Sequence, residues 1–301
     1  MMEPVLNVDR ITKRFKGMTA VDGVSFSVVR GEVAAILGPN GAGKSTTMHM
    51  LLGLLKPDGG SAELFGNAPG SKEARERIGV MLQDVSLMDA MKVREVLELI
   101  RGYYRNSMPH RDLLRLTGLS EEDLKKRAEK LSGGQKRRVS FALALAGDPD
   151  LLFFDEPTVG MDVGARARFW TTVKDLAAQG KTVIFSTHYL QEADDVASRI
   201  LLFNRGRLIA DGSPAQVKGQ LLRKTVSFKL PDKVSAERLR SLPNVLSMDL
   251  GMERIELVTD DTDRLLYALV TADIGASDIT IGQGRLEDAF TELTRTEEGV
   301  V

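Results

Sequence analysis

The segment 33–46 constrains the fold more than any other part of the chain. A wholly apolar run at residues 33–37 leads directly into Gly-Pro-Asn-Gly-Ala-Gly-Lys-Ser-Thr at residues 38–46. Such a short apolar run is expected of a strand that is buried on both faces of a parallel sheet. A helix should follow from Lys44 to about Leu55, because Lys-Pro-Asp-Gly-Gly comes next and would end it. The segment therefore predicts a strand, a glycine-rich loop and a helix, as in α/β folds.

The loop itself matches Gly-x4-Gly-Lys-Ser, a pattern that cradles phosphate. Glycines let the backbone wrap closely around a phosphate, and the loop amides and helix N-terminus direct partial positive charge toward it. Lys44 would neutralise phosphate oxygens, and the Ser45 hydroxyl would ligate Mg²⁺. A plain glycine-rich turn with an exposed lysine is disfavoured by the strand before the loop and the helix after it. The expected contacts are Gly38, Pro39, Asn40, Gly41, Ala42, Gly43, Lys44, Ser45 and Thr46.

A second apolar run, residues 151–154, ends on two carboxylates, Asp155 and Glu156. The carboxyl ends of parallel strands face the ligand crevice, and successive side chains point in opposite directions. The two acids can therefore take separate roles. Asp155 would hold Mg²⁺, and Glu156 would polarise an attacking water as general base. The alternative is a solvated acidic turn, which the phosphate loop upstream disfavours.

Between these two features lies a second glycine pair, in Leu-Ser-Gly-Gly-Gln at residues 131–135. Ser132 is a good N-cap for a following helix, and Gly133 and Gly134 let the start of that helix approach a ligand without a Cβ clash. This would be a second helix N-terminus suited to an anion. It comes at the end of a helical region, so it need not face its own phosphate loop. A plain capped helix start is the alternative.

The order of the predicted elements divides the chain into two domains, 1–220 and 221–301. Alternating strands at Val5–Ile11 and Val24–Val29 begin the first domain, and residues 73–130 have the composition of a mostly helical region. We place a helical subdomain at about 84–148. The α/β pattern then returns, with helices at 133–146, 164–179 and 190–196, strands at 151–155 and 182–186, and strands near 199–209.

A composition shift at 214–224 marks the start of a small α+β domain. Its predicted strands are Val226–Leu230, Val245–Leu250, Ile255–Val258 and Ile279–Gly282, and its predicted helices are Ser235–Ser241, Thr262–Ala272 and a closing helix at Arg285–Leu293. No catalytic cluster is recognisable there. The domain is either a packing or dimer-supporting module or a regulatory or cargo-linked one.

Composition excludes several classes of function. The chain has 41 basic and 42 acidic side chains, a formal net charge of -1, so no global field favours nucleic acid. The basic run at 136–138, with Arg94, Arg101 and Arg105 upstream, is interpreted as a solvated face. There is no cysteine, which excludes disulfides and Cys-based metal sites and suits a reducing cytosol. We see no signal-peptide pattern and no apolar stretch near the ~20 residues that span a bilayer.

Taken together, these motifs resemble those of the ATP-binding cassette (ABC) ATPases, over roughly residues 4–215. Leu-Ser-Gly-Gly-Gln at 131–135 is similar to the family's signature motif, and Gln83 to its Q-loop glutamine. Residues 160–162, Gly-Met-Asp, are similar to the D-loop, with methionine where leucine is commoner. His188 resembles the switch histidine. Phe15 sits where an aromatic residue stacks on adenine, although tyrosine is more usual there.

The resemblance implies a fold and a set of roles. The fold is an α/β P-loop NTPase with a mixed sheet, an N-terminal antiparallel β subdomain and a helical subdomain, to which this chain adds the small α+β domain. The activity is ATP hydrolysis, with ATP and Mg²⁺ as ligands. The signature would close on the γ-phosphate held by the other subunit of a head-to-tail dimer. The implied catalytic residues are Glu156, His188 and Gln83, the implied metal ligands are Ser45, Gln83 and Asp155, and the implied nucleotide contacts beyond the loop are Phe15, Ser132, Gly133, Gly134, Gln135 and Asp162.

The end of the chain, Leu286–Leu293, and the stretch 161–170 resemble ATPase subunits of bacterial drug and polysaccharide exporters. That resemblance implies an exporter whose permease subunits are separate chains, a homodimer of nucleotide-binding subunits, and no nucleic acid partner. It also implies a protein that is soluble when isolated and held at the cytoplasmic face of the membrane through the permease. A soluble ATP-driven switch acting on nucleic acid or ribosomes, and an importer ATPase, stay open as alternatives.

Overall fold

The fold was analysed in a computed structural model that describes residues 4–83, 87–221, 224–230, 236–251, 254–259, 261–272 and 274–283. The chain divides into two compact units, Met1–Pro214 and Ala215–Val301. The division falls in the region where the composition of the sequence changes.

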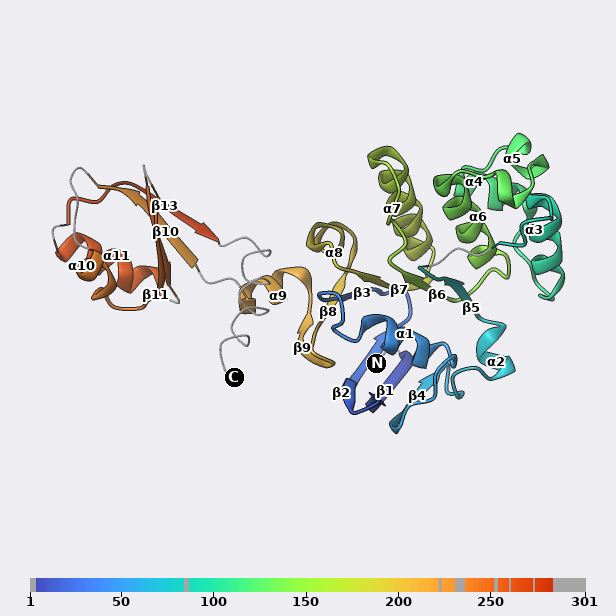
Figure 1. Ribbon diagram of the computed structural model, residues 1–301, viewed down its shortest axis with the longest axis horizontal. Coiled ribbons are helices and arrows are strands. Elements are labelled where there is room, and N and C mark those ends of the chain that lie inside the picture. The colour runs from blue at the N-terminus through green and yellow to red at the C-terminus, as the bar shows by residue number, and fades with distance from the viewer. Residues whose placement is uncertain are drawn as a thin grey trace. The chain divides into compact units, whose positions relative to one another are not determined.

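A mixed central sheet organises the first unit (Figure 1). Its strand order is β5-β6-β7-β3-β8-β9, and every neighbouring pair is parallel except β8 and β9. Because all side chains of β3, β6 and β7 are buried, these strands carry continuous apolar runs rather than alternating ones. The strands are β3 (Val33–Leu37), β5 (Ile78–Met81), β6 (Leu151–Asp155), β7 (Thr182–Thr187), β8 (Arg199–Asn204) and β9 (Arg207–Gly212).

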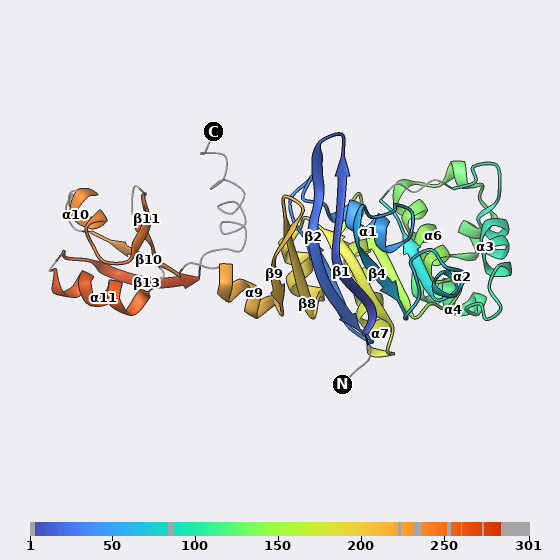
Figure 2. The same ribbon diagram turned by 90° about the horizontal axis from the view of Figure 1, so that it is seen from below.

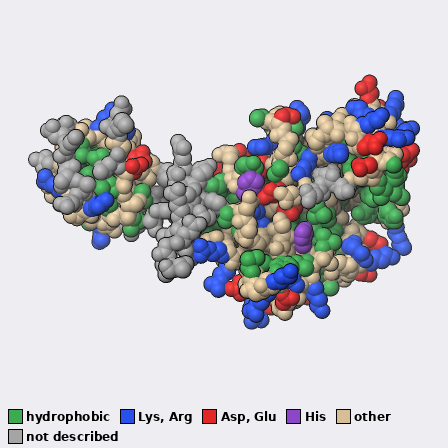
Figure 3. Space-filling view, viewed as in Figure 1, with side chains coloured by type: hydrophobic (Ala, Val, Ile, Leu, Met, Phe, Trp, Pro, Cys, Tyr) green, Lys and Arg blue, Asp and Glu red, His purple; other side chains and the backbone are tan. Residues whose placement is uncertain are grey.

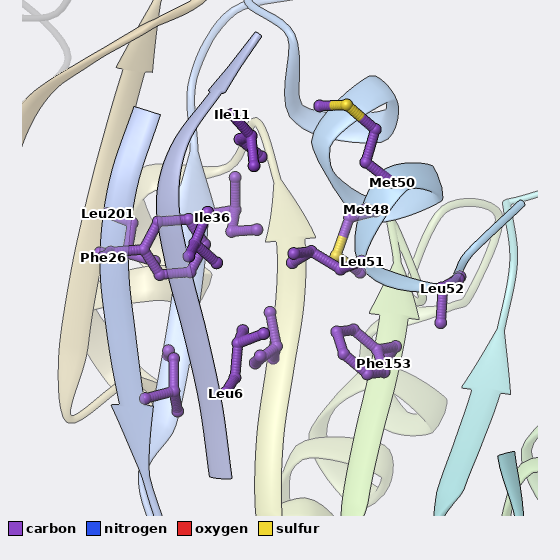
Figure 4. Close-up of a cluster of buried hydrophobic side chains, with 14 of the residues drawn as sticks. Leu6, Ile11, Phe26, Ile36, Met48, Met50, Leu51, Leu52, Phe153 and Leu201 are labelled. Carbon is purple, nitrogen blue, oxygen red and sulfur yellow. The ribbon is translucent and has the colours of Figure 1, made fainter. Parts of the chain in front are cut away.

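An antiparallel sheet covers one side of the central sheet, with order β2-β1-β4, and α1 (Lys44–Leu51) lies beside it (Figure 2). The strands are β1 (Pro4–Phe15), β2 (Met18–Val29) and β4 (Gly59–Leu64). Their inward side chains meet those of α1 and the central sheet in one buried cluster. Figure 4 shows its members turned toward one another, among them Leu6, Ile11, Phe26, Ile36, Met48, Leu51, Phe153 and Leu201.

Helices cover the opposite side of the central sheet, namely α7 (Val163–Ala178) and α8 (Leu190–Val196). Aromatic side chains fill the space between them and the strands. Phe154 and Phe169 pack edge to face with centroids 5.5 Å apart, and Phe169 continues to Trp170 at 4.9 Å. Neighbours in β6 thus face opposite cores, Phe153 toward α1 and Phe154 toward α7, as strand geometry requires.

A helical subdomain is inserted between β5 and β6 (Figure 1). Its helices are α3 (Val93–Gly102), α4 (His110–Thr117), α5 (Glu121–Lys125) and α6 (Gly133–Leu145), with a short 3-10 turn at Ala128–Lys130. Helix α6 packs directly on β5. There is no room for a side chain at Gly79, because a Cβ there would lie 2.0 Å from the Ala144 carbonyl oxygen of α6. Only glycine permits this approach.

The predicted α/β organisation is confirmed, and the helix and strand boundaries mostly agree within a few residues. Three details were wrong. Residues 73–130 contain β5, which is too short to produce a strand pattern of its own. Helix α1 ends at Leu51 rather than Leu55. A helix at Pro214–Leu221, α9, was not predicted, because its apolar side chains are too few to show a helical period.

The second unit is a small antiparallel sheet with helices, the predicted α+β arrangement. The sheet order is β11-β12-β10-β13. Its core includes Val226, Phe228 and Leu257 from the strands and Leu265 and Leu269 from α11. The elements are β10 (Lys224–Lys229), α10 (Ala236–Arg240), β11 (Val245–Leu250), β12 (Ile255–Thr259), α11 (Thr262–Thr271) and β13 (Ser277–Gln283). The predicted helix at Arg285–Leu293 lies outside the described residues.

A buried carboxylate, Asp123, joins α5 to the start of α6. Its Oδ1 accepts hydrogen bonds from Gln135 Nε2 at 2.7 Å and Lys126 Nζ at 2.8 Å, and Ser120 and Asp123 form a capping box. Burial alone would raise the pKa of Asp123, but the hydrogen bonds from Lys126 and Ser120 outweigh it and lower the pKa to about 2 from 3.8. The folded chain therefore favours the ionised form.

We predict that Asp123→Asn destabilises the first unit by about 2 kcal/mol at pH 7, the value that corresponds to this pKa difference. Since the pKa is lowered on folding, the stabilisation is present above pH 4 and is lost as the pH falls toward 2. Urea unfolding followed by the fluorescence of Trp170, the single tryptophan, measures it. Asp112→Asn, which removes a surface pair with Arg115, is the control and should cost less than about 1 kcal/mol. Equal stability of wild type and Asp123→Asn at pH 7 would contradict the prediction.

Candidate functional site

The loop at 38–43 is held by its own chain in a conformation that requires glycine. Gly41 and Gly43 have φ of 81° and 100°. A Cβ on Gly43 would lie 2.4 Å from the Ala20 carbonyl oxygen, so the loop also packs directly against the backbone of β2 at Ala20. Gly206, in the turn after β8, donates its N–H to the Ala42 carbonyl at 3.0 Å. The loop therefore begins α1 in a fixed shape, with the first backbone N–H groups of the helix free of intrahelical partners.

Lys44 is buried, although it is the first residue of α1. Its Nζ donates to the Gly38 and Pro39 carbonyls at 2.8 and 3.0 Å, and it lies 4.0 Å from Glu156 Oε1. Burial lowers the pKa of Lys44, while the negative charges of Glu156 and Asp155 raise it. The ammonium group is thus held over the loop, beside the carboxylates at the end of β6.

Asp155 points to the loop from the end of β6. Ser45 Oγ donates to Asp155 Oδ1 at 3.3 Å, across 110 residues of sequence. Ser186 Oγ donates to the same oxygen, because β6 and β7 are paired in parallel with Asp155 opposite Ser186. Asp155 is only 3% exposed. Ser45 and Asp155, two of the three predicted metal ligands, are thus in contact, whereas the third, Gln83, contacts Glu156.

Glu156 follows in a left-handed backbone conformation, with φ of 45°. Its N–H donates to Ser186, to the carbonyl at 3.2 Å and to the hydroxyl at 3.0 Å. Its carboxylate meets His188 Nδ1 at 3.1 Å and Gln83 Nε2 at 3.3 Å. An ionised carboxylate only accepts hydrogen bonds, so Nδ1 of His188 carries the proton in this contact. The structure therefore brings the three predicted catalytic residues together, because Gln83 and His188 both contact the Glu156 carboxylate.

A pocket of about 440 Å³ opens beside this cluster. Phe15, at the end of β1, lines it with a ring that is 43% exposed, and Lys13 Nζ lies 5.7 Å from the ring centroid. The predicted aromatic contact is therefore on the same pocket as the loop. The lining residues are Phe15, Met18, Ala20, Asn40, Gly41, Gly43, Lys44, Ser45, Thr46, Gln83 and Glu156.

The signature lies elsewhere. Ser132 caps α6 in a reciprocal capping box: its Oγ accepts from Gln135 N at 3.3 Å, and Gln135 Oε1 accepts from Ser132 N at 3.0 Å. Among the described residues, the lining of the loop pocket includes none of residues 132–135. A Cβ on Gly133 or Gly134 would meet no described heavy atom within 4 Å. No neighbouring group within the described part of the chain therefore requires glycine at position 133 or 134.

Asp162 also stands apart from the loop pocket. It caps α7, with Oδ1 accepting from Ala165 N at 2.8 Å, and that hydrogen bond lowers the pKa of Asp162. Its side chain is otherwise exposed on the loop that follows Glu156. An anionic cap at a helix N-terminus is favourable in its own right.

Sequence reasoning missed two contributors to the site. Ser186 donates to the Asp155 carboxylate and accepts the backbone N–H of Glu156, and its position could have been found from the strand pairing that the apolar runs imply. Met18 and Ala20, in the first residues of β2, line the pocket beside Phe15. Nothing in their local sequence marks them, because their position depends on the folding of the antiparallel sheet over the loop.

The sequence matches the ABC transporter family over residues 21–159. It is 36% identical to the daunorubicin/doxorubicin resistance ATP-binding protein of Streptomyces peucetius, over 94% of this chain and 90% of that one. It is 40% identical to the Nod factor export ATP-binding protein I of Burkholderia pseudomallei, over 97% of each chain.

Solved structures agree with the sequence matches. The ATP-binding subunit of an ABC transporter superposes with a TM-score of 0.66 at 27% identity, covering 72% of this chain and 92% of that one. A dimeric ATP-binding cassette in a post-hydrolysis state, bound to ADP and phosphate, gives 0.64 at 27% identity, covering 69% and 98%. The chain therefore belongs to the ABC transporter family, as one of its ATP-binding, ATP-hydrolysing proteins.

Proposed function

We propose that this chain is the ATPase subunit of an exporter, that it works with separate permease subunits, and that its ATP is enclosed between two nucleotide-binding subunits. One observation carries the catalytic part. Lys44, Ser45, Asp155, Glu156 and His188, from distant parts of the sequence, converge at the carboxyl ends of β3, β6 and β7. Phosphoryl transfer requires positioned donors and charge around the γ-phosphoryl group, and this arrangement supplies both.

Each residue then has a role that its contacts support. The amides of residues 38–46 and the Lys44 ammonium bind the phosphates, and Phe15 stacks on the base. Glu156 orients and deprotonates the attacking water, and His188, hydrogen-bonded to Glu156, binds the γ-phosphate. Gln83 donates to the same carboxylate and changes partner when the nucleotide and its metal ion bind. Asp162 and the signature, residues 132–135, serve the nucleotide across the subunit interface.

The donors near Lys44 suit Mg²⁺. Among the described residues, no group of three or more His, Cys, Asp or Glu side chains could hold a metal by itself. Mg²⁺ is commonly bound by one or two protein oxygens together with substrate phosphates. Ser45 Oγ and Asp155 Oδ1, 3.3 Å apart, fit that mode, and Gln83 lines the same pocket as Ser45. When bound there, Mg²⁺ supplies charge neutralisation for the β- and γ-phosphate oxygens.

The capped start of α6 supports the proposal that a second subunit completes the nucleotide site. It combines the partial positive charge of a helix N-terminus with a serine and a glycine pair that has open space above it. This surface cannot serve the loop pocket of its own chain in the present arrangement, since the two are separate. A second copy placed head to tail would bring it onto the nucleotide, and the cassette named above, which is dimeric and bound to ADP and phosphate, supports an assembly of two copies.

Export is supported by the relatives, which align along nearly the whole chain and are named for drug resistance and Nod factor export. No helix within the described ranges is long and apolar enough to cross a bilayer. Figure 3 shows hydrophobic side chains gathered over α3, where Leu99 is 40% and Tyr103 75% exposed. We assign the permease contact to this surface. For the second unit, we favour a packing role that supports the dimer.

Replacing the proposed base tests the catalytic assignment. We predict that Glu156→Gln retains ATP binding, because the phosphate contacts remain, but slows turnover by about 10²-fold or more. Nucleotide affinity is measured by fluorescence titration and turnover by phosphate release. Glu76→Gln, on an exposed side chain directly after α2 (Lys72–Arg75), is the matched control and should leave both unchanged. Near-native turnover of Glu156→Gln would exclude Glu156 as the base.

Mixing two inactive chains tests the shared site. Lys44→Ala disables the loop of its own chain, and Ser132→Arg disables the signature that it lends to the other. A heterodimer of the two keeps one intact site, so we predict that the mixture regains activity although each variant alone has almost none. Phosphate release is measured against the mixing ratio. A mixture as inactive as its components, under conditions where wild type is active, would contradict the shared-site proposal.

Co-purification tests the partner. We predict that the tagged chain, isolated from detergent-solubilised cells, carries a hydrophobic multi-span protein, and that Tyr103→Glu reduces its recovery severalfold. Tyr267→Glu, an equally exposed tyrosine on α11, is the control. Ribosomal RNA in place of a membrane protein would instead support the soluble switch. Unchanged recovery with Tyr103→Glu would remove the α3 surface from the proposal while leaving the permease in it.

A further inference from the structure

A second carboxylate, Glu192, is buried behind the catalytic cluster and does not touch the loop pocket. It lies in α8, and its side chain is 6% exposed, whereas Asp195 on the same helix is exposed. A buried carboxylate is costly unless charge and hydrogen bonds compensate it. The partners that compensate Glu192 come from separate loops of the site.

Both carboxylate oxygens of Glu192 are hydrogen-bonded to threonines, one in the loop after β6 and one at the end of β7. Thr158 Oγ1 donates to Oε1, and Thr187 Oγ1 donates to Oε2 at 2.9 Å. Thr158 and Thr187 are both almost fully buried, at 1% exposure. Thr187 Oγ1 also accepts the N–H of Tyr189 at 3.0 Å, so its hydroxyl fixes the backbone on both sides of His188.

These two threonines are close in sequence to the catalytic pair. Thr158 is two residues after Glu156, and Thr187 immediately precedes His188. By binding both, Glu192 fixes the loop after β6 relative to the loop after β7. These two loops carry Glu156 and His188, whose carboxylate and Nδ1 lie 3.1 Å apart.

A third partner extends the connection to α7. Arg166 Nε lies 3.5 Å from Glu192 Oε1, and the Arg166 guanidinium stands over the Tyr189 ring, 5.4 Å from its centroid. The N–H of Arg166 also donates to the carbonyl of Asp162 at 2.9 Å. This is a backbone hydrogen bond of the first turn of α7, so the Arg166 side chain joins Glu192 to the helix that Asp162, assigned above to the subunit interface, caps.

We propose that Glu192 is a positioning residue, which holds Glu156 and His188 in register with each other and with the Asp162 loop. It touches neither the loop pocket nor the phosphate-binding residues, so it acts through its threonine and arginine partners. The proposal rests on the catalytic roles given above to Glu156 and His188. It predicts a defect in turnover without a defect in ATP binding.

The variants separate the parts of this network. Glu192→Ala removes all its contacts and should lower kcat about 10- to 100-fold, the scale expected when reacting groups are displaced by about 1 Å. Glu192→Gln keeps the shape but leaves Arg166 without its counter-charge, and should have a smaller effect. Thr158→Val removes one hydroxyl at constant size. In each case the affinity for ATP should stay within about twofold of wild type.

A double-mutant cycle distinguishes positioning from general packing. If Thr158 acts through Glu192, then Thr158→Val with Glu192→Ala should be no slower than Glu192→Ala alone, because coupled residues are not additive. Asp195→Asn, on the exposed side of α8, is the control and should leave kcat unchanged. Additive losses in the cycle, or weakened ATP binding in parallel with kcat, would overturn the positioning role. The variant Thr158→Val keeps the test available if Glu192→Ala fails to fold.

A second readout does not depend on hydrolysis. The chain has three histidines, so the ring ¹⁵N resonances of His188 can be assigned by comparison with His188→Ala. Without nucleotide, Glu192→Ala should shift those resonances and leave His49 and His110 unchanged, whereas Asp195→Asn should shift none of the three. Unchanged His188 resonances would overturn the proposal. If the resonances shift but wild type hydrolyses no ATP, the proposed catalytic function fails and the link from Glu192 to His188 stands.

Discussion

The parallel pairing of β3, β6 and β7 is the constraint on which the site depends. In this register Leu37 lies opposite Thr187, and Asp155 opposite Ser186, so the three strands end at one edge. The loop begins after β3, the acids stand at the end of β6, and His188 follows β7. A slip of one residue would turn Asp155 away from Ser45 and exchange the cores that Phe153 and Phe154 fill. The apolar side chains that fix the register thus fix the chemistry.

The same dependence explains which features could be predicted. The loop and the acids were predictable because short apolar runs ending in glycine or carboxylate are local signals. The capping box at Ser132 and Gln135 is local too. The short strand β5, by contrast, is recognisable only as a partner of β6. Ser186, Thr158 and Thr187 owe their roles to the way the strands are paired. Nothing in the local sequence distinguishes them from other serines and threonines.

In the proposed function, each chain holds the parts of a nucleotide site in two places. The loop, Asp155 and Glu156 are assembled and mutually hydrogen-bonded, while the signature presents a capped helix start with open space above its glycines. Within the described part of this unit, no packing contact requires glycine at position 133 or 134. A glycine costs stability near a helix start unless something must come close. We infer that what comes close is the nucleotide of a second subunit.

Glu156 occupies a strained position, and the strain has a consequence for coupling. A non-glycine residue with φ of 45° persists only where its surroundings hold it, and here both the backbone and the carboxylate are held by groups on other elements. Gln83 reaches the carboxylate from the segment that leads into the helical subdomain, and His188 from the end of β7. Movement of the helical subdomain would therefore act on the proposed base through Gln83. Movement at the Asp162 loop would act on it through Arg166 and Glu192. The two surfaces proposed to contact other subunits would thus both act on the Glu156 carboxylate, so hydrolysis would depend on both contacts.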